Sequence, residues 1–313
     1  MLTPTKKILE KADRKNYAVP AFNINNLEIL QGVIRGAVNM RSPVIVQTSQ
    51  GALEYAGMEN LGVLVRQMAG KYPIPIAFHL DHGKDTDVVI RAIKSGYYTS
   101  VMYDGSHLPY KHNVVNTKKL VKLAHRYGIS LEAELGSIPG KEDNVDVSVR
   151  DAFYTDPVMA QDFVQKTDCD FLAVSIGTAH GPNKFTDRSY LDFPRLREIE
   201  SRVRRPLVLH GASGIPKNLL SMFKKYSNVL HDENRLANAR GVSSAHIKKA
   251  IAMGIDKINI DSDLRIAFLV AVREVLIRDH HVFDPRKILA PARDLIASVV
   301  ERKIRLFGSE NKA

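Results

Sequence analysis

Eight short runs of apolar and β-branched residues recur along this 313-residue chain, and most are followed by a stretch with the periodicity of an amphipathic helix. They occupy residues 17–24, 42–49, 74–82, 100–106, 130–137, 171–178, 205–213 and 257–263. Near-continuous apolar strands that alternate with helices are typical of a parallel sheet covered by helices. The number of units predicts an α/β fold, a (β/α)8 TIM barrel. A doubly wound open sheet is the alternative, but no Gly-x-Gly-x-x-Gly follows the first run.

Two segments depart from this alternation. The apolar, helix-periodic sequence after residue 263 predicts extra C-terminal helices that lie outside the barrel or against a partner. Residues 217–241 separate the seventh and eighth runs and predict a loop excursion, which is either functional or mobile. We interpret residues 1–313 as a single barrel domain.

The composition limits the cellular compartment and the partners that we expect for the protein. Cys169 is the single cysteine, which excludes an internal disulfide framework and fits a reducing compartment. The N-terminal residues lack the apolar core of a signal peptide, and no apolar run is long enough to span a membrane, so we expect a cytoplasmic protein. The net charge of +11 raises the question of nucleic-acid binding. The basic residues are scattered over predicted helices without interleaved aromatic residues, so we expect neither a nucleic-acid nor a membrane partner.

Histidines end three of the predicted strands. In a TIM barrel the active site is built from the C-terminal ends of the strands. His82, His180 and His210 occupy such positions, and each precedes a glycine. Three neutral imidazoles that leave positions open for water or substrate suit a catalytic zinc ion. A lone histidine at a strand end is more often structural, and we interpret the remaining histidines, including His79, in that way.

Carboxylates, amides and hydroxyls end the other strands. Glu132 and Glu134 are two residues apart on one strand and therefore point to the same side, into the barrel. Glu134, nearer the mouth, is a candidate for a second or alternative metal position together with Asp104, whereas Glu132 is a candidate for a lower-layer hydrogen-bonding group. The glycine-containing loop that follows carries Glu142 and predicts a movable flap. The remaining polar residues at strand ends are Asn23, Ser49, Asp81, Asn259, Asp261, Ser262 and Asp263.

The seventh strand runs into a loop suited to phosphate. Residues Gly211 to Gly214 offer backbone N–H groups and the Ser213 hydroxyl with little side-chain bulk. TIM barrels frequently bind phosphate with the loops after strands seven and eight. Together with a metal site, this loop favours a phosphorylated substrate.

Several of these segments resemble one known family. The segments "HLDHG", "LEAELGSIPGKED", "GTAHGPNK", "LVLHGASGIP", "GIDKINIDSDLRIAF" and "DPRKILAPARDLI" are similar to those of class II, zinc-dependent fructose-bisphosphate aldolases. The resemblance runs nearly from end to end, and tagatose-bisphosphate aldolases share most of it. It implies reversible cleavage of fructose 1,6-bisphosphate to dihydroxyacetone phosphate and glyceraldehyde 3-phosphate in glycolysis and gluconeogenesis. Cleavage of tagatose 1,6-bisphosphate is the alternative, and a zinc-dependent hydrolase on the same barrel is a further one.

The resemblance also implies residue roles. His82, His180 and His210 would hold Zn²⁺, and Asp104 and Glu134 would form an alternative metal position. Asp81 would be the proton donor to the hydroxyl of the departing aldehyde, and Glu142 would exchange the proton on the dihydroxyacetone phosphate carbon. Substrate-binding residues would be Asn23, Ser49, Gly181, Lys184, Gly211, Ser213, Asn259, Asp261, Ser262 and Arg265, the last near the distal phosphate with Asp261. A monovalent cation (Na⁺ or K⁺) near the phosphate and a homodimer or homotetramer are also implied.

The chain departs from the family pattern at a few positions. Pro20 stands where glycine is common, no tyrosine precedes Lys184, and Ser262 stands where threonine is usual. These departures leave the substrate preference and the subunit contacts open. A Schiff-base aldolase would need a lysine in the barrel mouth, but the sixth and seventh strands have none and Lys257 lies at the start of the eighth.

Overall fold

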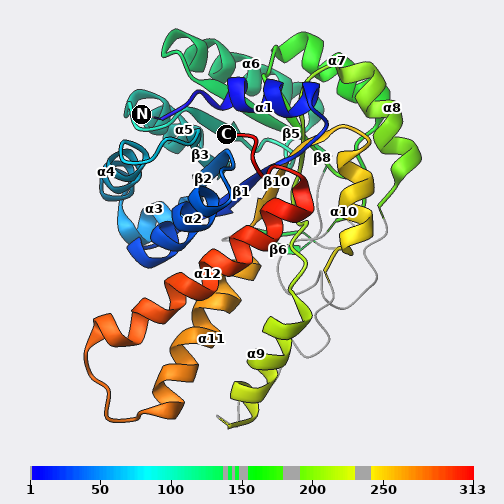
Figure 1. The fold of residues 1–313 in the computed structure, drawn as a ribbon. Coiled ribbons are helices and arrows are strands. Elements are labelled where there is room, and N and C mark those ends of the chain that lie inside the picture. The colour runs from blue at the N-terminus through cyan, green and yellow to red at the C-terminus, as the bar shows by residue number, and fades with distance from the viewer. Residues whose placement is uncertain (1, 137–139, 143–144, 148–153, 179–190, 230–240) are drawn as a thin grey trace.

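Eight parallel strands close into a barrel in the computed structural model of residues 1–313 (Figure 1), which confirms the predicted TIM barrel. The structure describes residues 2–136, 140–142, 145–147, 154–178, 191–229 and 241–313. Around the barrel the order is β1-β10-β9-β8-β5-β4-β3-β2, with β2 paired to β1. The strands are β1 (Val19–Asn23), β2 (Val44–Thr48), β3 (Ile76–Gly83), β4 (Ser100–Tyr103), β5 (Ser130–Leu135), β8 (Phe171–Val174), β9 (Leu207–Leu209) and β10 (Ile255–Ile260).

Helices follow the strands and cover the outside of the barrel, with short polar caps at several of their starts. The side chain of Asn26 accepts from the N–H of Ile29 at the start of α2, and Asp156 accepts from Met159 in the same way at α7. The covering helices are α2 (Leu27–Asn39), α3 (Gln50–Ala56), α4 (Met58–Ala69), α5 (Thr86–Lys94), α6 (Tyr110–Arg126), α7 (Pro157–Thr167), α8 (Phe193–Val203) and α10 (Ser244–Ile251). After β5 the chain forms an antiparallel pair, β6 (Gly140–Glu142) and β7 (Val145–Val147).

The N-terminal helix α1 (Thr5–Arg14) closes the end of the barrel at which the strands begin, which we call the lower end. The N–H of Thr3 donates to the carbonyl of Ile76, the first residue of β3, at 2.7 Å. Ile8 and Leu9 of α1 are buried in one cluster with apolar residues from inside the barrel. Apolar side chains of α1 and of the strands therefore fill this end of the barrel, and the predicted site lies at the opposite end, where the strands finish.

The barrel interior changes from apolar to polar along its axis. Alternate residues of each strand point inward, and the lower ones are apolar: Val19, Ala21, Ile45, Ala77, Met102, Phe171, Ala173 and Val208. The upper ones are buried but polar: Asn23, Gln47, His79, Asp81, Glu132, Glu134, His210, Lys257 and Asn259. Burial of so many polar groups is costly unless they are paired, so this layer marks a functional centre rather than a folding core.

The C-terminal helices extend away from the barrel. Figure 1 shows α9 (Lys217–Val229), α11 (Ser262–Arg278) and α12 (Pro285–Phe307) reaching beyond it, and α11 packs against both α9 and α12. α12 also packs against α2, where a Cβ at Gly32 would lie 2.6 Å from the Ile296 side chain. The predicted extra helices are confirmed. The 217–241 excursion begins as helix α9, and its residues 230–240 lie outside the described part.

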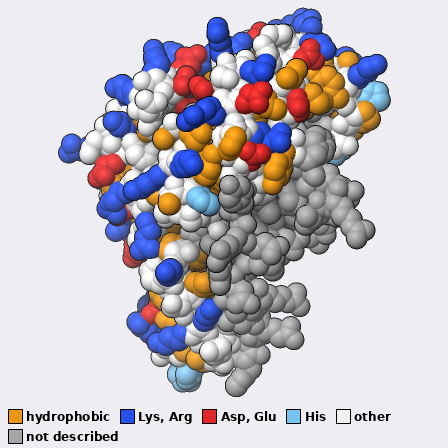
Figure 2. All heavy atoms as spheres, turned by 90° about the vertical axis from the view of Figure 1, so that its right-hand side faces the viewer, with side chains coloured by type: hydrophobic (Ala, Val, Ile, Leu, Met, Phe, Trp, Pro, Cys, Tyr) orange, Lys and Arg blue, Asp and Glu red, His pale blue; other side chains and the backbone are white. Residues whose placement is uncertain are grey.

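Charged side chains are distributed over the surface. In Figure 2 the lysines and arginines spread across the face shown, with acidic side chains among them in its upper half. Among the described helices, none has the length and apolar character needed to cross a membrane.

Candidate active site

His82 occupies an unusual backbone conformation at the end of β3. Its φ of 46° lies in the left-handed region, which a residue other than glycine rarely adopts and which costs on the order of 1–3 kcal/mol. A Cβ at the next residue, Gly83, would lie 2.5 Å from the carbonyl oxygen of Met102. Only a glycine therefore fits after this turn. Such strained residues cluster at functional sites.

His82 and His210 meet at the mouth of the barrel. The Nε2 atom of His82 lies 2.7 Å from the Nδ1 atom of His210, and the rings are edge-on. On the far side of each ring a carboxylate accepts: Asp104 Oδ2 lies 3.0 Å from His82 Nδ1, and Glu132 Oε1 lies 2.8 Å from His210 Nε2. This network assigns the ring protons to the nitrogens that face the carboxylates. The two nitrogens that face each other, His82 Nε2 and His210 Nδ1, are then the ones directed at a shared metal position.

Asp81 lies beside this pair and is held by three amides. Its Oδ2 accepts from Asn23 Nδ2 at 2.8 Å and from Gln47 Nε2 at 3.0 Å, and its Oδ1 accepts from Asn259 Nδ2 at 2.9 Å. The three amide donors fix the orientation of the carboxylate. With Asp81 only 1 % exposed, the carboxylate is shielded from bulk water.

Asp104 and Glu134 lie on the other side of His82. Glu134 Oε2 is 3.8 Å from His82 Nδ1, and Asp104 Oδ1 accepts from the hydroxyl of Ser106. Burial alone would raise the pKa of Asp104. The hydrogen bond from His82 and the nearby Lys84 ammonium outweigh burial and hold the pKa of Asp104 below its ordinary value. Asp104 is therefore a carboxylate at neutral pH.

The donor atoms at the mouth fit a zinc ion. Asp81, His82 and His210 bring one donor atom each within 4.8 Å of one another, and so do His82, Asp104 and Glu134. Imidazole nitrogens whose other ring nitrogen is backed by a carboxylate are typical zinc ligands, and both His82 and His210 have such a carboxylate. His82 belongs to both groups, as two neighbouring metal positions would require. His180, the third expected ligand, lies outside the described residues.

A second polar layer lies directly beneath His210. The Oε2 atom of Glu132 lies 2.8 Å from the Nζ atom of Lys257 and 3.4 Å from the Nε2 atom of His79, and all three residues are fully buried. Burial would raise the pKa of Glu132, but the Lys257 charge and the His210 hydrogen bond hold it below its ordinary value. Burial and the Lys257 charge lower the pKa of His79 well below its ordinary value. The prediction that Glu132 is a lower-layer hydrogen-bonding group is confirmed.

Lys257 lies closer to the site than its sequence position indicated. β10 begins at Ile255, and the Lys257 side chain reaches the layer under His210 rather than the far end of the barrel. Its ammonium is fully buried in the ion pair with Glu132. A Schiff base needs an amine that the substrate can reach, and the amine of Lys257 is fully buried against Glu132.

The loops after β9 and β10 lie side by side because these strands are paired. Gly211 has a φ of 63°, and a Cβ at Gly214 would lie 2.7 Å from the Val242 carbonyl oxygen, so both positions need glycine. The Nζ atom of Lys303 ties the two loops together, 3.0 Å from the Gly214 carbonyl oxygen and 2.8 Å from Asp263 Oδ1. Ser213 is buried in the first loop and Ser262 begins α11 after the second. Gly181 and Lys184 lie outside the described residues.

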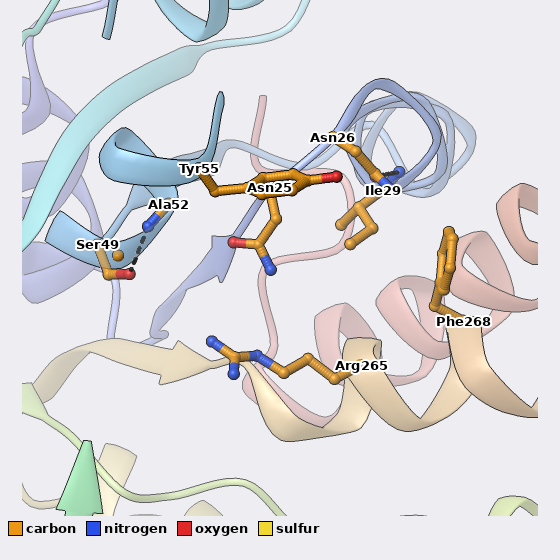
Figure 3. Close-up of a pocket in the computed structure, with 9 residues that line it drawn as sticks. Asn25, Asn26, Ile29, Ser49, Ala52, Tyr55, Arg265 and Phe268 are labelled. Carbon is orange, nitrogen blue, oxygen red and sulfur yellow. Dashed lines mark hydrogen bonds between the residues drawn. The ribbon is translucent and has the colours of Figure 1, made fainter. Parts of the chain in front are cut away.

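A pocket of about 460 Å³ opens beside this mouth (Figure 3). Ser49 and Asn25 line it from the ends of β2 and β1, and Arg265 lines it from α11. Figure 3 shows the Arg265 guanidinium and the Asn25 amide extending into the same space. The Nε atom of Arg265 donates to Asp261 Oδ1 at 2.8 Å, which holds the guanidinium near the strand end. Asp261 and Arg265 are the two residues that the resemblance placed near the aldehyde half of the substrate, whereas Asn25 was not predicted.

Sequence reasoning missed three residues of the centre: Gln47, His79 and Lys257. Gln47 is the one polar side chain in the inward-facing positions of β2, so its place in an apolar run was the available signal. Nothing local marks His79 or Lys257 as partners, because their contacts are made across the barrel. Glu142 is the last residue of β6, and its side chain lies outside the described part.

The whole chain matches known aldolases. A family model described as Fructose-bisphosphate aldolase class-II matches residues 3–312. The fructose-bisphosphate aldolases of Thermus caldophilus and of Helicobacter pylori (strain ATCC 700392 / 26695) are 44% and 42% identical to it, over 100% of each chain. The crystal structure of the YdjI aldolase from Escherichia coli K12 superposes with a TM-score of 0.80 at 33% identity and covers 100% of both chains. The chain belongs to the class II fructose-bisphosphate aldolase family.

Proposed function

We propose that this protein cleaves fructose 1,6-bisphosphate reversibly to dihydroxyacetone phosphate and glyceraldehyde 3-phosphate as a zinc-dependent aldolase. The observation that carries the proposal is the carboxylate of Asp81, held by three amides within 4.8 Å of the donor atoms of His82 and His210. An acid-base group next to a buried metal site is what cleavage of a carbon–carbon bond beside a carbonyl requires. The full-length relatives named fructose-bisphosphate aldolase support this substrate.

His82 and His210, together with His180, would hold the zinc ion, and Asp104 and Glu134 would provide its alternative position. When bound, zinc supplies a Lewis acid for the carbonyl oxygen at C2, where negative charge develops as the C3–C4 bond breaks. The carboxylates of Asp104 and Glu132 keep the lone pairs of the two imidazoles directed at that site.

Asp81 would move the proton of the C4 hydroxyl. In cleavage that hydroxyl loses its proton while the C3–C4 bond breaks and the aldehyde forms, and in the reverse direction the same proton returns to the aldehyde oxygen. The amides of Asn23, Gln47 and Asn259 orient the carboxylate, and its burial keeps competing water away. Glu142 of the flap would exchange the proton on the dihydroxyacetone phosphate carbon.

Two binding regions would hold the two phosphates. The loops that carry Gly211, Ser213 and Ser262, with Gly181 and Lys184, would bind the dihydroxyacetone phosphate end, next to a monovalent cation. Ser49 and Arg265 would bind the distal phosphate in the pocket of Figure 3. Asp261 would hold the Arg265 guanidinium in place there. Asn23 and Asn259 would lie between them at the reacting carbons.

We propose further that the protein is cytoplasmic and forms a homodimer or homotetramer. Phosphorylated sugars would be its only ligands besides metal ions, with no nucleic-acid or membrane partner. The distribution of the basic side chains supports this, because among the described residues on the face in Figure 2 they form no single patch.

A coupled cleavage assay tests the proposed function. Fructose and tagatose 1,6-bisphosphates are offered to the protein as isolated, after chelation, and after zinc is restored. We expect cleavage of the fructose substrate to disappear with chelation and return with zinc. Faster cleavage of the tagatose substrate would overturn the substrate assignment. Activity that survives complete zinc removal would overturn the metal site.

A further inference from the structure

A buried ion pair crosses the barrel beneath the candidate metal site. Glu132 comes from β5 and Lys257 from β10, two strands separated by β8 and β9 in the barrel order. Their side chains meet at 2.8 Å with no exposure to solvent. Replacing a buried ion pair by apolar side chains of similar volume is often neutral or stabilising. Stability alone therefore does not account for an ion pair at this place.

The two oxygens of Glu132 have different partners. Oε1 accepts from His210 Nε2 at 2.8 Å, while Oε2 accepts from Lys257 Nζ at 2.8 Å and lies 3.4 Å from His79 Nε2. His79 is itself fixed through its Nδ1, which lies 2.7 Å from the hydroxyl of Ser100. A carboxylate with a partner on each oxygen cannot rotate. The direction of Oε1, and with it the ring of His210, is therefore fixed from below.

We propose that Glu132 and Lys257 are positioning residues that hold the imidazole of His210 with its proton on Nε2, so that the Nδ1 lone pair faces His82 and the zinc ion. The proposal rests on the proposed function only in assuming that this site binds zinc. A carboxylate accepts at both oxygens, so it serves the lysine and the His210 N–H together. A neutral amide at position 132 could not serve both.

This difference predicts the effect of Glu132→Gln. Lys257 has only N–H donors and needs an acceptor, so the amide oxygen of the glutamine turns toward Lys257 and its NH₂ group toward His210 Nε2. That nitrogen must then accept, and the ring proton moves to Nδ1, where it blocks the metal. We expect zinc to bind about 10- to 100-fold more weakly, as for other residues that orient metal-bound histidines.

The double variant Glu132→Gln/Lys257→Met is the decisive comparison. Without the lysine the amide can turn over, so that its oxygen accepts from His210 Nε2 and the original ring form returns. We expect zinc affinity to recover at least threefold relative to Glu132→Gln alone. If Glu132 and Lys257 merely stabilised the fold, removing the second partner would weaken zinc binding further or leave it unchanged, and no recovery would be measured.

The measurements are made on the full-length protein. Zinc dissociation constants come from competition with a chelator, and the ¹⁵N chemical shifts of the His210 ring in the zinc-free protein report which nitrogen carries the proton. Lys166→Met is the control, because Lys166 is also ion-paired, but with Asp162 on the exposed surface of α7 and away from the site. We expect its zinc dissociation constant to equal that of the wild type.

The outcomes separate this proposal from the proposed function. If the wild-type protein neither binds zinc nor cleaves the substrate, the proposed function is wrong. Wild-type zinc binding that Glu132→Gln leaves within threefold, or an Nε2 proton retained in that variant, would overturn the positioning role. If the double variant does not fold, the ring shifts of the nearly isosteric Glu132→Gln protein still decide the question.

Discussion

Replacing Asp81 by asparagine separates acid-base chemistry from metal binding. The variant keeps the size of the side chain, but it has no carboxylate to accept the C4 proton. General acid-base catalysis contributes about 10²- to 10⁴-fold, which corresponds to about 2.7–5.5 kcal/mol of transition-state stabilisation. We expect kcat for cleavage to fall by that factor. His82 and His210 keep their own carboxylate partners, Asp104 and Glu132, so zinc should remain bound.

Two measurements on this variant check the reasoning. Zinc content is measured beside the rate of the coupled cleavage assay, and hydrogen exchange on the dihydroxyacetone phosphate carbon is followed separately. Exchange should persist, because Asp81 acts on the other half of the substrate. Asp85→Asn is the control, because it makes the same Asp-to-Asn change at the N-cap of α5, outside the site. Loss of zinc from the Asp81 variant would show that Asp81 is a metal ligand, and the assigned role would be wrong.

Three further changes test the surroundings of the site. Lys303→Met leaves Asp263 buried without its cation, so the free energy of unfolding in denaturant should fall by about 3–5 kcal/mol, and adding Asp263→Asn should restore part of it. Burial raises the pKa of Asp256 to about 8, so the folded protein keeps a proton that the unfolded chain loses above about pH 4. Wild-type stability should therefore fall across that window relative to Asp256→Asn, by up to about 1.4 kcal/mol per pH unit, and equal slopes would contradict the burial argument. Arg265→Ala should raise KM for the bisphosphate about 10-fold or more while proton exchange on dihydroxyacetone phosphate stays unchanged, because only the distal phosphate loses its partner.

The sequence was sufficient for the barrel because the signal for each strand is local. An apolar run between two helix-periodic segments can be recognised from a few consecutive residues. The rule that alternate residues share a face correctly placed Glu132 and Glu134 inside the barrel. The left-handed turn at His82 has no such signal. Sequence reasoning placed His82 at the end of its strand, but it could not show that Nε2 would face His210.

The prediction for residues 217–241 failed in part for a different reason. The segment stands outside the alternation of strands and helices, and the sequence predicts a loop excursion there. In the structure residues 217–229 form α9, whose apolar residues Leu219 and Phe223 are buried and which packs against α11. A helix that folds on another helix outside the barrel depends on a contact between distant segments, which the local pattern does not contain.

Lys257 shows that the position of a residue along its strand does not determine which layer of the barrel its side chain reaches. Neighbouring strands are staggered, so that Lys257 of β10 lies in register with Val19 of β1 and Val208 of β9, both in the apolar lower layer. The long lysine side chain nevertheless rises to Glu132, whose own strand is three places further around the barrel. Register and tilt, not distance from the strand end, determine which side chains meet. The layer that orients His210 is therefore encoded in the stagger of the whole barrel, and changes of register in β10 should disturb it as strongly as changes of Lys257 itself.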